Sequence, residues 1–378
     1  MKNPRAANWR SSLLKNVLPL LPGLALVALI AWLGIWSSEW IGLNLLGLER
    51  SPISGIMMAI ILGLILSNFF TLPATLRPGV AFSVKHILRL GIILLGIRLS
   101  LGDVLRLGLL GIPLILFCVV GAILLARWLG RRLNLSPAMS TLIAVGTSIC
   151  GATAIVATGP SIEARDEELT YAIANITIFG LLAMFLYPFL AHALFAQDAT
   201  AAGLFLGTSI HETAQVAGSA LIYDQLYQSQ AVLDGATVTK LVRNVLMILI
   251  IPVMSYLHMR QMGTSGTARA VKLTGLFPLF ILGFLGMALV RTVGDATLES
   301  GAAWGLLDSA AWASLTGTLR VWAENFLAMA MAAVGLGTSF RLLRGLGLRP
   351  FYVGFAASVA VGALSLLGIF AFRAAGLI

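Results

Sequence analysis

Two short polar stretches lie inside long apolar segments of this chain, and they restrict the folds that it can adopt. One runs over residues 146–154 and the other over 207–214, and each begins with the same tetrapeptide, Gly-Thr-Ser-Ile. The second also carries an ionisable pair, His211 and Glu212. In a bilayer, polar or irregular backbone is tolerated only where it faces other protein or a water-filled cavity. The two stretches therefore predict a polar site at mid-membrane depth, and such a site is typical of transport.

The composition is that of a polytopic membrane protein. The 378 residues are 59% hydrophobic and 11% charged, with a mean hydropathy of +0.96, whereas soluble proteins carry roughly 25% charged residues. The net charge of +10 would indicate nucleic acid in a soluble protein, but membrane proteins gather Lys and Arg in cytoplasmic loops. We therefore expect the lipid bilayer as a partner and no nucleic acid. Cys118 and Cys150 both lie in apolar segments and predict no disulfide framework.

Eleven apolar segments approach the length of about 20 residues that a transmembrane helix needs. They are 20–41, 53–70, 87–101, 109–128, 137–160, 169–192, 202–222, 236–258, 273–290, 321–340 and 351–372. We predict an all-α polytopic membrane protein with a cytoplasmic tail over residues 1–19 and a single transmembrane domain over 20–378.

The distribution of positive charge gives the orientation. If the N-terminus lies in the cytoplasm, 15 Lys and Arg residues fall on the cytoplasmic side and 6 on the outer side. Because Lys and Arg are enriched in cytoplasmic loops, we predict a cytoplasmic N-terminus and, after an odd number of crossings, an outer C-terminus.

Faint internal repetition predicts that two parts of the chain share one plan. The Gly-Thr-Ser-Ile of residues 146–149 recurs at 207–210, and Pro188 and Pro252 occupy matching places in the segments that follow. Inverted repeats with interrupted helices at the midplane are common in transporters. Segments 137–160 and 202–222 are each either a broken helix that spans the membrane or a re-entrant hairpin, and their length favours the spanning form.

The second polar stretch holds six polar side chains within residues 208–215, which is costly in a bilayer. Imidazole titrates near neutral pH and suits proton-linked transport, while a pair that only packs helices together is the alternative. Substrate-binding residues predicted here are Thr208, Ser209, His211 and Thr213, and the predicted proton-coupling residues are His211 and Glu212.

A metalloprotease would need the motif His-Glu-x-x-His, but Gln215 stands where the second histidine would be. We therefore expect no catalytic residue, no metal and no cofactor.

Hydroxyl groups and glycines fill the first polar stretch. Small residues also allow close helix packing, which is the alternative to a binding role. A helix broken here would direct its freed N–H groups and positive dipole end into the membrane, where they favour an anion. The substrate-binding residues predicted in this stretch are Thr147, Ser148, Cys150, Gly151 and Thr153.

Lys240 and Arg243 lie inside a predicted span, three residues apart and hence on one helix face, and Asn244 follows them. We predict that both cations line the site and bind substrate, because Arg donates paired hydrogen bonds to oxyanions. Two cations against the single carboxylate of Glu212 leave the site positive, which favours an anion over a sodium ion.

These motifs together resemble the YeiH-type family of bacterial inner-membrane proteins, to which sulfate export is attributed. The resemblance covers residues 54–372. It is carried by Ile149-Cys150-Gly151-Ala152-Thr153-Ala154-Ile155, Asp166-Glu167-Glu168, Tyr171-Ala172-Ile173, Gly207-Thr208-Ser209-Ile210-His211-Glu212-Thr213, Lys240-Leu241-Val242-Arg243 and Gly335-Leu336-Gly337-Thr338. This chain has Glu212 where the family usually has Asp. The resemblance implies inverted repeats and crossed, broken helices similar to those of the cation/proton antiporter and anion transporter group.

We therefore expect a secondary transporter, not an enzyme, that exports a small inorganic or organic oxyanion such as sulfate or a related sulfur compound and is coupled to protons. The alternatives are a cation/proton antiporter, which would want a mid-span Asp, and a membrane enzyme that uses His211 as base. A homodimer is left open.

The orientation can be tested with C-terminal fusions. An alkaline phosphatase fused to the C-terminus should be active in the periplasm, and a fluorescent protein that matures only in the cytoplasm should stay dark, because the 15 to 6 charge bias puts this end outside. An inactive phosphatase fusion together with a bright fluorescent fusion would rule out an odd number of crossings.

Overall fold

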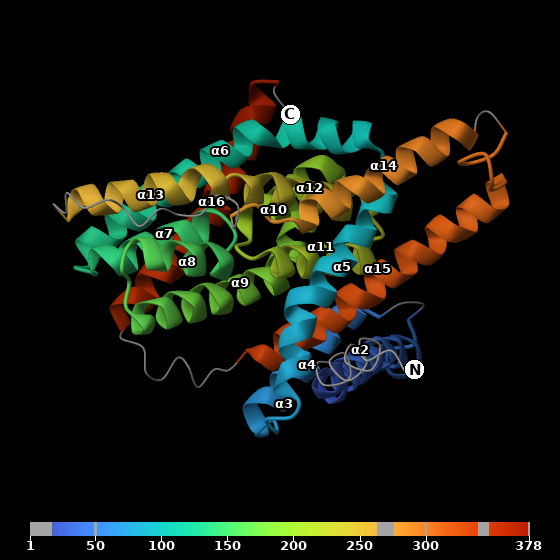
Figure 1. Cartoon of the computed structure of the whole chain (residues 1–378), viewed down its shortest axis with the longest axis horizontal. Coiled ribbons are helices and arrows are strands. Elements are labelled where there is room, and N and C mark those ends of the chain that lie inside the picture. The colour runs from blue at the N-terminus through green and yellow to red at the C-terminus, as the bar shows by residue number, and fades with distance from the viewer. Residues whose placement is uncertain (1–16, 49–50, 263–275, 299–300, 339–347, 377–378) are drawn as a thin grey trace, which may run out of the picture. The chain divides into compact units, whose positions relative to one another are not determined.

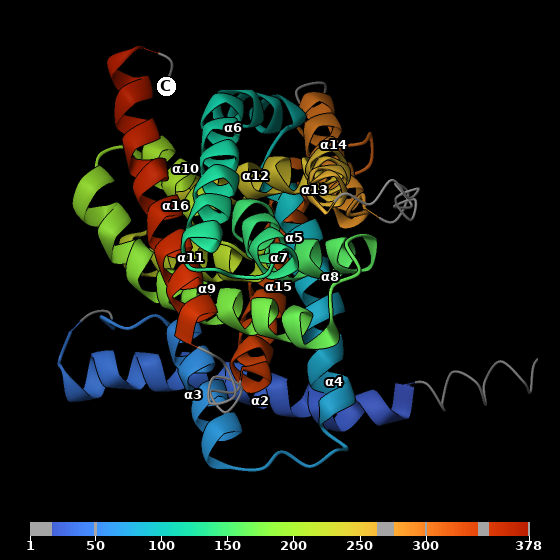
Figure 2. The same cartoon turned by 90° about the vertical axis from the view of Figure 1, so that its left-hand side faces the viewer.

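The computed structural model describes residues 17–48, 51–262, 276–298, 301–338 and 348–376, and this part of the chain folds into helices without a β-strand (Figures 1 and 2). Seven helices are long and apolar enough to cross a membrane, or eight if a bent pair counts as one crossing. The predicted all-α polytopic class is thereby confirmed, while the number of eleven crossings is not. The helices form two compact units, which are described separately.

The first unit comprises residues 1–95 and 314–340. Its helices are α2 (Leu21–Trp40), α3 (Gly55–Phe69), α4 (Arg77–Phe82), α5 (Leu88–Leu95) and most of α15 (Ser309–Gly337). Glycine permits close contact between α3 and α15, because a Cβ added at Gly63 would meet the backbone of Ala332 and Leu336. The predicted tail falls almost wholly outside the described residues.

The second unit comprises residues 96–313 and 341–378 and holds both polar stretches. Its helices are α6 (Leu101–Arg132), α7 (Pro137–Ser148), α8 (Ala152–Thr158), α9 (Asp166–Phe195), α10 (Ala199–Ser209), α11 (Thr213–Tyr227), α12 (Gln230–Val245), α13 (Met247–Gln261), α14 (Phe280–Leu298) and α16 (Leu348–Ala374). The single domain predicted over residues 20–378 stays a prediction.

Every predicted apolar segment overlaps a helix or a pair of helices, but several boundaries were wrong. The segment predicted over 321–340 belongs to α15, which begins at Ser309, and residues 273–275 and 339–340 lie outside the described residues. The third segment, predicted over 87–101, belongs to a helical run over Arg77–Arg98. Arg77, Lys85 and His86 make the first half of this run polar, and a search for continuous apolar residues therefore begins too late.

The first polar stretch forms the tip of a re-entrant hairpin, α7–α8, which we call hairpin 1. Its two ends lie together: the hydroxyl of Ser136, before α7, donates to Glu168, after α8, over 2.5 Å. Both arms also contact the last turns of α13, where Thr141 Oγ1 lies 3.3 Å from His258 Nδ1 and Ser161 Oγ lies 2.6 Å from Ser255 Oγ. The chain therefore enters and leaves at the same end of this unit.

The second polar stretch forms the tip of an equivalent hairpin, α10–α11, which we call hairpin 2. Its far end returns to its start, because Tyr227 at the end of α11 stacks on His192 near the end of α9, with ring centroids 3.6 Å apart. The unbroken helix α9 has 30 residues, or roughly 45 Å, and separates the two hairpin bases. Hairpin 1 starts near its first turn and hairpin 2 near its last, so the hairpins enter from opposite ends (Figure 1).

The spanning form that length favoured for segments 137–160 and 202–222 is therefore wrong, and both are hairpins. A segment of 21 to 24 residues is as long as one full crossing or two half crossings, so length could not separate them. Of the charges used for orientation, only Arg165 changes sides. The oppositely directed hairpins agree with the predicted inverted repeats. Pro188 lies in α9, directly after hairpin 1, and Pro252 lies in α13, which forms a bent pair with α12 after hairpin 2.

Cysteine labelling in intact cells tests this arrangement. In a variant without native cysteines, single cysteines at the exposed positions Arg132 and Glu167 should react from one side of the membrane. Cysteines at Gln197 and Gln230 should react from the other side. A membrane-impermeant maleimide measures the sidedness. If Arg132→Cys and Glu167→Cys label from opposite sides, hairpin 1 spans the membrane and this arrangement is wrong.

Candidate functional site

The tips of the two hairpins meet inside the second unit. Tip 1 is residues 149–151 and tip 2 is residues 210–212. The backbone N–H of Ala152, next to tip 1, donates to Glu212 Oε1 of tip 2 over 3.1 Å. Gly151 makes this approach possible, because it has φ +68° and an added Cβ would meet the Glu212 side chain. The two polar stretches, 61 residues apart in sequence, thus form one site.

Lys240 of α12 reaches both tips with its ammonium group. Nζ donates to the carbonyl oxygens of Ile149 over 2.9 Å and of Ile210 over 3.1 Å, and it also donates to that of His211. The side chain is buried, with 1% exposed. An ammonium group has three N–H donors, so all of them are used on backbone carbonyls.

Arg243 lies one turn further along α12, and its guanidinium group donates to backbone carbonyls at the ends of α7 and α10. Nε donates to the carbonyl of Ser148 over 2.7 Å, and Nη1 donates to those of Thr208 over 2.7 Å and Ile210 over 3.1 Å. Nη2 donates to the carbonyl of Thr147. Four hydrogen bonds therefore join this buried guanidinium group to the two hairpins.

These contacts have a common electrostatic cause. The last carbonyls of a helix have no partner within the helix and carry a partial negative charge of about half an electron. The carbonyl ends of α7 and α10 converge near α12, and Lys240 and Arg243 neutralise both. Removing one partner of such a buried charge interaction typically costs about 3–5 kcal/mol.

The remaining predicted binding residues divide by accessibility. Thr147, Ser148, Thr208, Ser209 and His211 are buried, and the four hydroxyl groups bond to carbonyls one turn back in their own helices. Cys150 and Gly151 are buried too. In contrast, Thr153 is exposed, and Glu212 and Thr213 are partly exposed. Of the predicted binding and coupling residues, only these three are not buried.

Helix α16 supports tip 2 through residues that the sequence did not single out. Ser358 Oγ lies 2.7 Å from His211 Nε2, and Ser365 Oγ lies 2.7 Å from Thr208 Oγ1. The two serines are seven residues apart, which is two helical turns, and therefore face the same way. This spacing of two serines in an apolar segment is the one sequence signal from which Ser358 and Ser365 could have been predicted.

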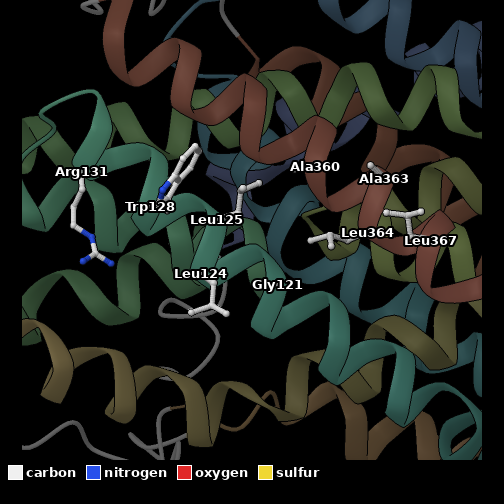
Figure 3. A pocket seen from close by; sticks show the side chains of 9 residues that line it. All are labelled: Gly121, Leu124, Leu125, Trp128, Arg131, Ala360, Ala363, Leu364 and Leu367. Carbon is white, nitrogen blue, oxygen red and sulfur yellow. The ribbon is translucent and has the colours of Figure 1, made fainter. Parts of the chain in front are cut away.

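A separate cavity of about 650 Å³ lies between α6 and α16, which run side by side (Figure 2; Figure 3). Leu124, Leu125, Leu364 and Leu367 line it, with Trp128 and Arg131 at one end. It lacks the converging polar groups that fix a small solute, so the hairpin tips are the better candidate site. Within the described ranges, no group of three or more His, Cys, Asp or Glu could hold a metal ion.

Comparison with known proteins identifies the family. A family model described as "Conserved hypothetical protein 698" matches residues 22–354. A UPF0324 membrane protein of Streptococcus agalactiae is 32% identical over 346 residues, covering 92% of this chain and 96% of that protein. The chain belongs to the UPF0324 membrane protein family.

Other members of this family are similarly close. A UPF0324 membrane protein of Corynebacterium glutamicum is 34% identical over 318 residues, covering 84% of this chain and 85% of its own length. One of Fusobacterium nucleatum is 31% identical over 330 residues, covering 85% and 92%. UPF0324 membership agrees with the resemblance to the YeiH-type family and confirms a multi-pass membrane protein. The substrate and coupling roles of the named site residues stay predictions.

The contact between the tips can be tested at Gly151. Gly151→Ala should lower the stability of the purified protein by about 1–3 kcal/mol, because alanine at this φ is strained and its Cβ would displace Glu212. Thermal unfolding in detergent measures the effect. Gly286→Ala is the matched control, because a Cβ there meets nothing within 4 Å. The midpoint of thermal unfolding of this variant should not fall. Equal midpoints for Gly151→Ala and wild type would contradict the close approach.

Proposed function

We propose that this UPF0324 protein is a secondary transporter that exports a small oxyanion, with the paired hairpin tips as its binding site. The observation that carries the proposal is the meeting of two oppositely directed hairpins around the buried cations Lys240 and Arg243 and the partly exposed carboxylate of Glu212. Irregular backbone and ionisable groups inside a membrane are costly, and they persist where they serve a solute pathway. Binding sites at the junction of inverted repeats are typical of secondary transporters.

An oxyanion fits the chemistry of the tips. The carboxylate of Glu212 already accepts a hydrogen bond from the Ala152 N–H, so the site is built to hold an oxygen anion beside tip 1. Thr153 and Thr213 lie close in sequence to tips 1 and 2, and because they are exposed and partly exposed, their hydroxyl groups can donate further hydrogen bonds.

Proton coupling follows from the position of Glu212. When an arriving oxyanion takes the Ala152 N–H, the displaced carboxylate loses its hydrogen bond in a poorly hydrated site. A carboxylate in that situation takes up a proton rather than remain charged and unpaired. Binding of the anion and uptake of a proton would then occur together, with His211 beside Glu212 as the neighbouring titratable group. The proton would travel in the same direction as the anion, and because a divalent anion with one proton keeps a negative charge, a membrane potential that is negative inside would favour export.

Sulfate or a related sulfur compound is the substrate that the family resemblance favours, and the outward direction rests on the same resemblance. The charge bias favours the cytoplasmic membrane of a bacterium, with the N-terminus inside and the C-terminus in the periplasm. His211 is fully buried, which argues against the alternative of a membrane enzyme that uses it as a base. A cation/proton antiporter would want an aspartate at the tips, and residues 146–154 and 207–214 contain none.

Flux in proteoliposomes tests the proposal. Radiolabelled sulfate should exchange across the membrane of wild-type vesicles, and a pH gradient should drive its net movement. Glu212→Gln should retain exchange, because the amide oxygen can still accept from Ala152, but pH-driven flux should fall to the level of protein-free vesicles. Thr237→Val is the control, since Thr237 bonds only within its own helix and both fluxes should persist.

Two results would count against the proposal. Absence of exchange with sulfate, sulfite and methanesulfonate in wild-type vesicles would remove the oxyanion substrate. Full pH-driven flux in Glu212→Gln would remove the coupling role, and Glu212 would then be a contact between the tips.

A further inference from the structure

Three polar residues of α12 lie near the tips but have different surroundings. Lys240 makes three hydrogen bonds and Arg243 makes four, all of them to backbone carbonyls of the two hairpins. Both side chains are 1% exposed. With its three N–H donors in use, Lys240 can contact a solute only after releasing a carbonyl of a hairpin tip. Arg243 has only one N–H left over.

Asn244, the next residue, is incompletely bonded. It is also buried, with 2% exposed, and its Nδ2 donates to Thr213 Oγ1 over 3.0 Å. No partner for its Oδ1 exists among the residues that the structure describes. A buried polar atom without a partner costs free energy, and a bound ligand or an ordered water is one reason for keeping it.

The position of this amide points to a ligand. Thr213 is the first residue of α11, a helix of 15 residues, and is partly exposed beside Glu212. Because a hydroxyl both donates and accepts, the amide can present either its oxygen or its NH₂ group to a neighbour without losing the bond to Thr213. The NH₂ group would give an oxyanion two donors.

We propose a division of labour on α12, which rests on the proposed function: Asn244 together with Thr213 contacts the transported oxyanion, whereas Lys240 and Arg243 are positioning residues that hold the hairpin tips together. This differs from the prediction made from the sequence, in which the two cations bind the anion directly.

The two roles predict opposite results for variants on one helix. Lys240→Met should destabilise the empty protein, because the carbonyls of tips 1 and 2 lose their donor. Asn244→Leu should leave the empty protein as stable as wild type or more stable, because an unpaired buried polar atom is removed. Its affinity for sulfate should fall at least about tenfold, as expected when hydrogen bonds to a charged ligand are lost.

A native thiol reports on the tips directly. Cys150 lies in tip 1 and is 6% exposed, while Cys118 lies in α6 and is 1% exposed. In Lys240→Met without ligand, maleimide should label Cys150 much faster than in wild type while Cys118 stays protected. General unfolding would expose both thiols. Lys240→Arg keeps a donor group and should restore protection of Cys150, and Thr237→Val on the same helix should change neither thiol.

The experiment combines thermal unfolding of the empty protein, labelling of both cysteines and binding of radiolabelled sulfate in detergent. The proposal is overturned for Lys240 if Lys240→Met is as stable as wild type with Cys150 protected and sulfate binding lost. It is overturned for Asn244 if Asn244→Leu binds sulfate like wild type. If wild-type protein binds none of sulfate, sulfite and methanesulfonate, the proposed function fails and Asn244 with it, while Cys150 labelling still decides the role of Lys240.

Discussion

Seven hydrogen bonds from Lys240 and Arg243 to backbone carbonyls hold the centre of this protein together. The first arm of each re-entrant hairpin ends in carbonyls that have no partner within the helix. An unsatisfied polar group costs several kcal/mol in hydrocarbon. Two such ends facing one another would also repel. The hairpins can therefore meet only where a third element brings cations to both.

That requirement explains the packing around α12. Helix α10 approaches α12 closely at glycines, since a Cβ at Gly203 would meet the backbone of Gly235 and Ala236, and one at Gly207 would meet Thr239. Larger residues on this face would push α10 outward and draw its last carbonyls away from the cations. Gly207, the glycine of the second Gly-Thr-Ser-Ile motif, is thus linked to the cations of α12 by geometry.

The sequence predicted the parts of the site but not their pairing. Polar residues within apolar segments, and the i,i+3 spacing of Lys240 and Arg243, are visible in any one segment. The partners of those cations were not predictable, because backbone carbonyls are the same in every residue and leave no signal. Ser358 and Ser365 were missed since two serines in an apolar helix are ordinary. Hairpins could not be distinguished from spanning helices, because half of a membrane crossed twice needs as many residues as one crossing.

The tips are electrostatically complete without a solute, and this has a kinetic consequence. Lys240 and Arg243 have carbonyl partners, and Glu212 has the Ala152 N–H. A carrier whose empty site contains unbalanced charge must bind a second ion before it can return, so it works as an obligate exchanger. A carrier with an internally neutralised site can return empty. A protein built in this way would drain a compartment of its solute without taking anything back.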